Sequence, residues 1–221
     1  NFRKLWAASA VSNLGDGIIY AAAPLLAASL TRDPFLVAFV MFMRGLPWLL
    51  FSLVGGAISD RVDRRRLMGV FNYARAGALG FLSLAVLFGF ANLPLLYAVF
   101  FVIGVCETFF DTASQTILPS VVAREDFERA NGRLEGARIV TNDLAGPSLG
   151  GLLFGVAAAV PFLLNAGAFA AAAALILALR GDFTPKGDAP AGAAGPTVAS
   201  ILADIREGLA WLARDRFLLL L

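Results

Sequence analysis

Long apolar stretches alternate with short polar ones along most of this chain. Five apolar stretches occupy about residues 5–30, 35–58, 67–91, 95–118 and 161–180. A helix of about 20 apolar residues crosses the hydrocarbon core of a bilayer. A further stretch ends at about residue 158 and follows a polar segment at 122–133, which we expect to be a loop that enters a helix. The pattern therefore predicts an all-α integral membrane protein with six transmembrane helices.

The pattern changes after residue 180. Residues 181–198 are rich in Gly, Pro and Ala, which is typical of a flexible linker. Within residues 199–221, Ile201, Ile205 and Leu209 share one face of a helix. We expect an amphipathic helix on the membrane surface, then the start of a seventh span. The predicted domains are a bundle at 1–180, a cytoplasmic linker at 181–198 and this surface segment.

Basic residues lie almost entirely on one side of the predicted spans. The outer loops hold only Arg32. The other side holds Arg3, Lys4, Arg61, Arg64, Arg65, Arg66, Arg124, Arg129, Arg133, Arg180 and Lys186. Because short loops rich in Lys and Arg stay in the cytoplasm, this asymmetry predicts a multi-pass protein of the cell inner (plasma) membrane with a cytoplasmic N-terminus.

Composition supports a membrane protein and excludes several other classes. The mean hydropathy is +0.77, and charged residues make up 15% of the chain, where a soluble domain has about 25%. The pI of about 9.0 accompanies a net charge of only +2, and the basic residues flank spans, so we expect no nucleic-acid partner. The chain has no histidine and one cysteine, Cys106. We expect no metal, no cofactor and no enzyme activity, since no nucleophile–base set is visible.

The loop after the second predicted span carries a recognisable spacing. It reads Gly56-x-x-x-Asp60-Arg61-x-x-Arg64-Arg65. This resembles the loop between the second and third spans of major facilitator superfamily transporters, in which Asp60 would act at the cytoplasmic gate. The chain has Asp63 where the family usually has a second glycine. The alternative is that the arginines are only a topology signal.

The fifth predicted span contains Gly146-Pro147-x-x-Gly150-Gly151, which resembles the fifth-span motif of antiporters in the same superfamily. Gly146 with Gly150, and Gly151 with Gly155, have the spacing that lets membrane helices approach closely. Pro147 lacks an amide donor and should bend the helix. Ordinary helix packing is the alternative interpretation.

The resemblance covers essentially the whole chain and is nearest to bacterial exporters of the enterobactin-exporter and macrolide-efflux kind. It implies the N-terminal six-helix half of a facilitator, with a C-terminal six-helix half as its partner. The fourth span of the family often carries an arginine that takes part in proton coupling. The fourth predicted span of this chain has no arginine and carries Glu107 and Asp111.

Charged residues inside a bilayer are costly, so each is a functional candidate. Asp16 lies roughly 16 Å into the first span and Arg44 roughly 14 Å into the second, from the opposite side. Both fall near the midplane, where they could pair or face substrate. Asp16 is the proposed proton-responsive group, and Glu107, near the middle of its span, is the next candidate. We expect a structural charge network among Arg75, Asp111, Arg138 and Asp143.

Together these features predict a transporter that exports a small molecule by alternating access, with protons as the coupling ion. One rival is an importer or lipid transporter of the same fold. Another is a membrane scaffold or receptor module that transports nothing, although such a module has no use for charges at the midplane.

Overall fold

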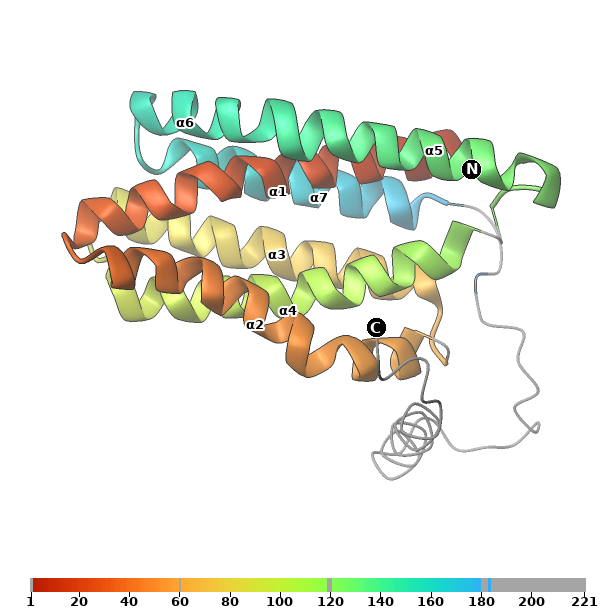
Figure 1. Ribbon diagram of the computed structural model, residues 1–221, viewed down its shortest axis with the longest axis horizontal. Helices are drawn as coiled ribbons and strands as arrows, with labels where there is room; N and C mark the ends of the chain where they lie inside the picture. The colour runs from red at the N-terminus through yellow and green to blue at the C-terminus, as the bar shows by residue number, and fades with distance from the viewer. Residues whose placement is uncertain (1, 60, 119–120, 180–182, 184–221) are drawn as a thin grey trace, which may run out of the picture.

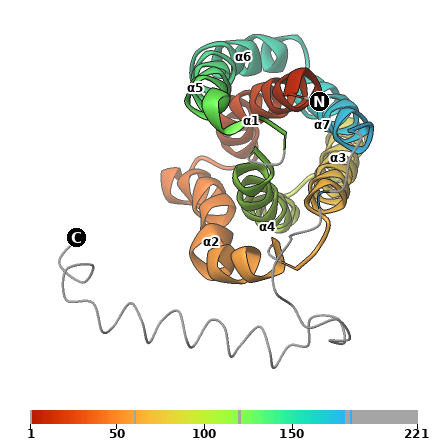
Figure 2. The same cartoon turned by 90° about the vertical axis from the view of Figure 1, so that its right-hand side faces the viewer.

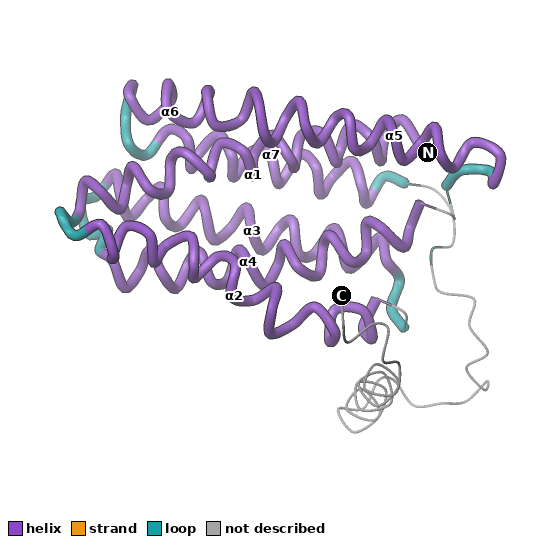
Figure 3. Tube along the Cα trace, in the orientation of Figure 1, coloured by secondary structure: helices purple, strands orange, loops and turns teal. Residues whose placement is uncertain are grey.

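The computed structural model describes residues 2–59, 61–118, 121–179 and 183. In this part of the chain all regular structure is helical (Figure 3). Asp60 lies outside the described residues. So do the predicted linker, apart from Phe183, and the predicted surface helix at 199–221.

Four long helices come first and follow the predicted ranges closely. They are α1 (Phe2–Leu30), α2 (Pro34–Ser59), α3 (Arg64–Leu87) and α4 (Leu93–Ile117). The third ends earlier than the expected residue 91, because Gly89 adopts a positive φ of 74° and the amides of Phe90 and Ala91 turn back to the Ala85 carbonyl. Asn92 then caps α4 by accepting a hydrogen bond from the Leu95 amide.

The fifth predicted span is one continuous helical rod with an irregular middle (Figure 1). After the short η2 (Arg124–Asp126), the rod consists of α5 (Phe127–Arg138), the π-helical η3 (Ile139–Ala145) and α6 (Gly146–Val156). The Gly146 amide bonds to the Thr141 carbonyl, five residues back. Pro147 follows at once and has no amide to donate to Asp143, so the widened turn lies where regular α-helical bonding is lost.

Five of the described helices are long and apolar enough to cross a membrane. They are α1, α2, α3, α4 over Leu93–Gln115, and α7 (Val160–Leu177). The α5–η3–α6 rod is not among them. The chain is therefore a multi-pass helical membrane protein, with five candidate spans in its described part.

The helices pack around the bundle in an order that differs from the chain order (Figure 2). Helix α1 packs on α6 and α7, α3 packs on α7 and α4, and α4 packs on α2. The α1 start, the α2–α3 connection, the α5 start and the end of α7 gather at one end of the bundle (Figure 1). This end, which we call the basic end, carries most of the basic residues in the described part of the chain.

Two apolar cores fill the interior. One contains Ile19, Leu79, Ile103 and Phe169, and the other contains Leu5, Met68, Phe110 and Ile176. Along α1, α3 and α4 the buried polar residues other than Ser83 occupy the positions between these two sets. The bundle thus consists of two apolar layers with a polar layer between them, and this layer holds the candidate site.

Candidate functional site

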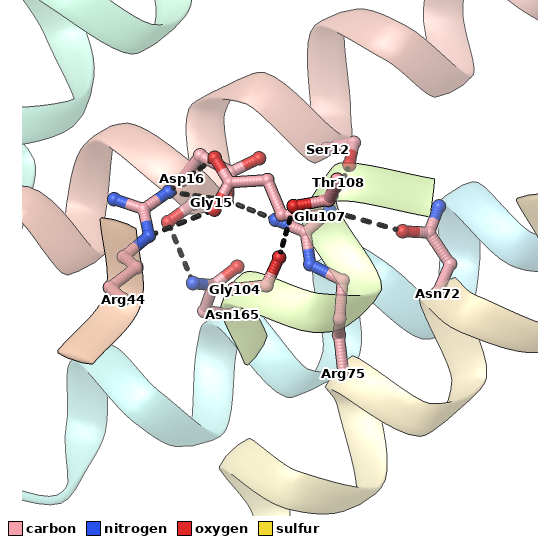
Figure 4. A network of polar contacts seen from close by, with 10 residues as sticks. All are labelled: Ser12, Gly15, Asp16, Arg44, Asn72, Arg75, Gly104, Glu107, Thr108 and Asn165. Atoms are coloured by element: carbon pink, nitrogen blue, oxygen red, sulfur yellow. Dashed lines mark hydrogen bonds and ion pairs between the residues drawn. The ribbon is translucent and has the colours of Figure 1, made fainter. Parts of the chain in front are cut away.

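Arg44 of α2 links three helices through one guanidinium group (Figure 4). Its side chain is only 4% exposed. Nε donates to Glu107 Oε2 at 3.0 Å and Nη2 to Glu107 Oε1 at 2.8 Å, while Nη2 also donates to Asp16 Oδ1 at 3.0 Å. The two bonds to Glu107 match the planar fork of arginine to both carboxylate oxygens. The structure therefore brings the three predicted pathway residues together.

Arg75 of α3 approaches the same Asp16 from another direction. Its Nη2 donates to Asp16 Oδ1, and Nη1 donates to Ser12 Oγ at 3.5 Å and to Asn72 Oδ1 at 3.4 Å. The guanidinium carbon lies 3.9 Å from the centroid of the Phe169 ring of α7, a favourable position for a cation over an aromatic face. Arg75 is completely buried.

These contacts make the buried cluster electrically balanced. Two arginines, Arg44 and Arg75, face two carboxylates, Asp16 and Glu107. Burial of a charge is tolerated when it is paired and hydrogen-bonded, and an uncompensated charge is strongly destabilising. We call Asp16, Arg44, Arg75 and Glu107 the charge cluster.

Asn165 of α7 fixes α1 next to the charge cluster. Its Nδ2 donates to the Gly15 carbonyl at 2.6 Å. A β carbon on Gly15 would overlap the Asn165 side chain, so only glycine fits this contact. Asn165, Ser12 and Asn72 were not among the residues predicted from the sequence. Their signal was present, since each is a polar residue within a predicted apolar span.

A cavity of about 290 Å³ opens beside the charge cluster. It is lined by Tyr20, Met41, Arg44, Gly45, Trp48, Gly104, Glu107, Thr108 and Asp111. The Glu107 side chain is 24% exposed and that of Asp16 only 7%. A molecule in this cavity would therefore contact Glu107 and Arg44, whereas Asp16 lies behind them.

The expected network of Arg75, Asp111, Arg138 and Asp143 is not formed as one unit. Arg75 belongs to the charge cluster, and Asp111 lines the cavity. Arg138 pairs with Glu135 at 2.7 Å and with Asp143 at 3.5 Å, and these side chains are about half exposed. The ion pairs thus join Arg138 to Asp143 but do not join this pair to Arg75 or Asp111, because depth along a span does not say which side of its helix a residue occupies.

The loop between α2 and α3, with the basic residues that follow it, contacts the end of α7, as does Lys4 of α1. Arg65 Nη1 donates to the Leu179 carbonyl at 2.8 Å, and Lys4 Nζ donates to the Ala178 carbonyl at 3.0 Å. Cations at the end of a helix satisfy its last carbonyls and its negative dipole end. Arg64 Nε reaches back to the Ser59 carbonyl at 3.4 Å, and the Arg61 amide bonds to the Ile58 carbonyl.

Asp63, the departure from the family spacing, has a role of its own. Its side chain accepts hydrogen bonds from the amides of Arg65 and Arg66 and so caps α3. In the same motif, a β carbon on Gly56 would meet none of the described atoms within 4 Å. One on Gly55 would lie 3.4 Å from Thr112 Oγ1. The close contact between α2 and α4 here therefore involves Gly55.

The two glycine pairs of the fifth-span motif differ in their surroundings. β carbons on Gly146 and Gly150 would press into the backbone of α1 at Gly17 and Ile18. β carbons on Gly151 and Gly155 would meet no described atom within 4 Å. Of the two predicted pairs, only the first is at a close helix contact among the described residues.

Paired charges that are buried inside a helical membrane bundle, next to a cavity, are typical of the substrate and ion pathways of membrane transporters. Among the described residues, no group of acidic or cysteine side chains is suited to a metal ion. The chain belongs to the transmembrane secretion effector family of the major facilitator superfamily, whose model matches residues 1–200.

Similar proteins include transporters of several bacteria. The chain is 28% identical to the uncharacterized MFS-type transporter YfiS of Bacillus subtilis over 220 residues, which cover 97% of this chain and 50% of that protein. It is 29% identical to the multidrug efflux pump Tap of Mycolicibacterium fortuitum (91% and 49% covered) and 27% identical to the enterobactin exporter EntS of Shigella boydii (73% and 41% covered). The chain spans half or less of the length of these relatives.

Proposed function

We propose that this chain is the N-terminal half of a facilitator that exports a small molecule by alternating access, coupled to protons. The family match supports a transporter, and two of the relatives are named as exporters. In this proposal the α5–η3–α6 rod also crosses the membrane. It is the fifth span along the chain and brings the number of spans to six. A C-terminal half completes the pathway, since facilitators consist of two six-helix halves with the substrate site between them.

One observation carries the functional proposal, namely that Arg44 is shared between a buried carboxylate and one that lines the cavity. Arg44 Nη2 donates to both carboxylates. Glu107 is part of the cavity wall, and Asp16 is not. Glu107 is therefore the better candidate for proton exchange, with Asp16 as the buried anchor.

The proposed coupling follows from charge balance. A proton bound to Glu107 removes one of the two negative charges that hold Arg44. The guanidinium is then free to leave Glu107 for Asp16 alone or for an acceptor on the substrate. Loss of the proton restores the three-helix link. The protonation state of one carboxylate thus changes which helices are tied together, as a two-state transporter requires.

The test uses the purified full-length transporter, this chain together with its C-terminal half, in proteoliposomes with an imposed pH gradient. The substrate is chosen first, as a compound that accumulates less in cells that express the protein. Glu107→Gln should keep substrate exchange down a concentration gradient and lose accumulation driven by the pH gradient. Asp111→Asn is the matched control, because Asp111 lines the same cavity but forms no ion pair with described residues. It should keep gradient-driven accumulation.

If the Glu107→Gln variant accumulates substrate as fast as the wild type, Glu107 is excluded as the coupling group. Asp16→Asn is then tested in the same assay. If no compound accumulates less in expressing cells, export itself is contradicted. Movement of the chosen substrate in the opposite direction in oriented vesicles would indicate an importer.

The proposed orientation has its own test. In a variant without Cys106, single cysteines at Asp63 and Arg124 should react with a membrane-impermeant maleimide only from the cytoplasmic side. A cysteine at Asp33 should react only from outside, since Asp33 precedes α2 at the opposite end of the bundle from Asp63 (Figure 1). Labelling of position 63 from outside would overturn the cytoplasmic placement of the basic end.

A further inference from the structure

A groove separates the first turns of α1 from the last turns of α5 at the basic end. Its volume is about 370 Å³. Its walls are Phe2, Arg3, Trp6, Arg133, Gly136 and Ala137. A neighbouring hollow of about 340 Å³ shares Phe2 and Arg133 with it. Neither hollow contains a residue of the charge cluster or of the cavity beside it.

The groove is positively charged, and its charged side chains have no ion-pair partner among the described residues. Both charged residues in its walls, Arg3 and Arg133, are arginines. Neither side chain forms an ion pair or hydrogen bond with another described residue. The nearby Glu135 is engaged by Arg138 at 2.7 Å. Two arginine side chains in the wall of the groove therefore have donors that no described residue uses.

The rest of the groove is apolar and open. Trp6 Nε1 donates to the Arg133 carbonyl at 3.1 Å, which fixes the indole ring in the wall. A β carbon on Gly136 would meet no described atom within 4 Å, so the surface that the described residues form is shallow there. Farther along the rod, Val140 and Leu144 are 56% and 63% exposed. Their four-residue spacing from Gly136 continues an apolar track along one side of the rod.

We propose that this groove binds an anionic phospholipid. Arginine forms charge-assisted, bidentate hydrogen bonds with phosphate, and basic pockets between membrane helices bind anionic headgroups. The phosphate would lie between Arg3 and Arg133, and Trp6 would lie at the level of the glycerol, as tryptophan does at membrane interfaces. The acyl chain would follow Val140 and Leu144. This assignment does not depend on which substrate the protein moves.

Native mass spectrometry of the detergent-purified protein tests the site. Phosphatidylglycerol and phosphatidylethanolamine with identical acyl chains are added in separate samples. We expect wild-type protein to retain phosphatidylglycerol several-fold more than phosphatidylethanolamine, and Arg3→Gln/Arg133→Gln to lose this preference. The charge-matched control is Arg32→Gln/Arg66→Gln, which removes one arginine at each end of the bundle and should keep the preference. Arg3→Lys/Arg133→Lys, which keeps both charges, should restore part of it.

Each alternative outcome overturns the proposal. Equal retention of the two lipids by wild-type protein shows that the groove does not select an anionic headgroup. Loss of the preference in the control variant shows a general effect of surface charge. Displacement of phosphatidylglycerol by millimolar inorganic phosphate shows a site for a free anion. Monodisperse gel filtration of each variant excludes misfolding as the cause.

Discussion

Arg75→Met should strongly destabilise the protein, and the double variant Asp16→Asn/Arg75→Met should recover most of the lost stability. The single change leaves the buried cluster with two carboxylates and one arginine, an excess of one negative charge. Breaking a buried ion pair by removing one partner costs about 3–5 kcal/mol, whereas replacing both partners by neutral groups is often close to neutral. The double variant again has equal numbers of positive and negative groups, Arg44 and Glu107.

The measurement is the apparent melting temperature in detergent for the wild type, both single variants and the double variant. Asp16→Asn alone leaves an excess positive charge and should also destabilise. If the loss of melting temperature in the double variant equals the sum of the losses in the two single variants, charge balance is not the reason why Asp16 and Arg75 are buried together. The packing of Arg75 on Phe169 would then be the dominant contribution.

The spans and their ends were largely predictable from the sequence. Runs of apolar residues set the helices, and short polar or Gly/Pro-containing turns set their ends, so α1 to α4 lie within a few residues of the predicted ranges. The earlier end of α3 reflects Gly89, whose positive φ a hydropathy pattern does not reveal. The span that ends near residue 158 was expected to follow the polar segment at 122–133 and to bend at Pro147. The structure begins this helix earlier, at Phe127, and places the π-helical segment η3 just before Pro147.

The membership of the charge cluster was only partly predictable. Counting residues from the ends of spans gives depth, and depth correctly grouped Asp16 with Arg44 and kept Glu107 as a candidate. It could not reveal that Arg75 faces Asp16, because that contact depends on how α1 and α3 are rotated about their axes. For the same reason, depth did not reveal that Asp111 lies in the wall of the cavity.

The position of the charge cluster between two apolar cores has a consequence for motion. Apolar layers on both sides keep the helices together when the ion pairs rearrange, since their burial does not depend on protonation. Under the proposed function, the ion pairs of the polar layer would rearrange while the apolar layers on both sides stay packed.

Gly146→Ala should destabilise the bundle, while Gly151→Ala in the same motif should not. A β carbon on Gly146 would lie 2.5 Å from Gly17 Cα and 2.7 Å from its carbonyl carbon, and backbone atoms cannot move aside as a flexible side chain can. Overpacking of this kind costs about 1–3 kcal/mol. The β carbon on Gly151 would meet no described atom within 4 Å. There the gain in helix propensity, about 1 kcal/mol for Gly to Ala, should leave stability unchanged or slightly higher.

Each variant adds one methyl group to the wild-type protein, and the two positions lie five residues apart in α6. Effects of expression and of detergent are therefore matched. Melting temperature and yield of monodisperse protein are measured together. We expect Gly146→Ala to lose both and Gly151→Ala to retain both. Gly17→Ala, on the opposite side of the contact, should behave like Gly146→Ala, because its β carbon would lie 2.9 Å from Gly146 Cα. Equal losses for Gly146→Ala and Gly151→Ala would show that the close approach of α1 and α6 is not what requires glycine in this motif.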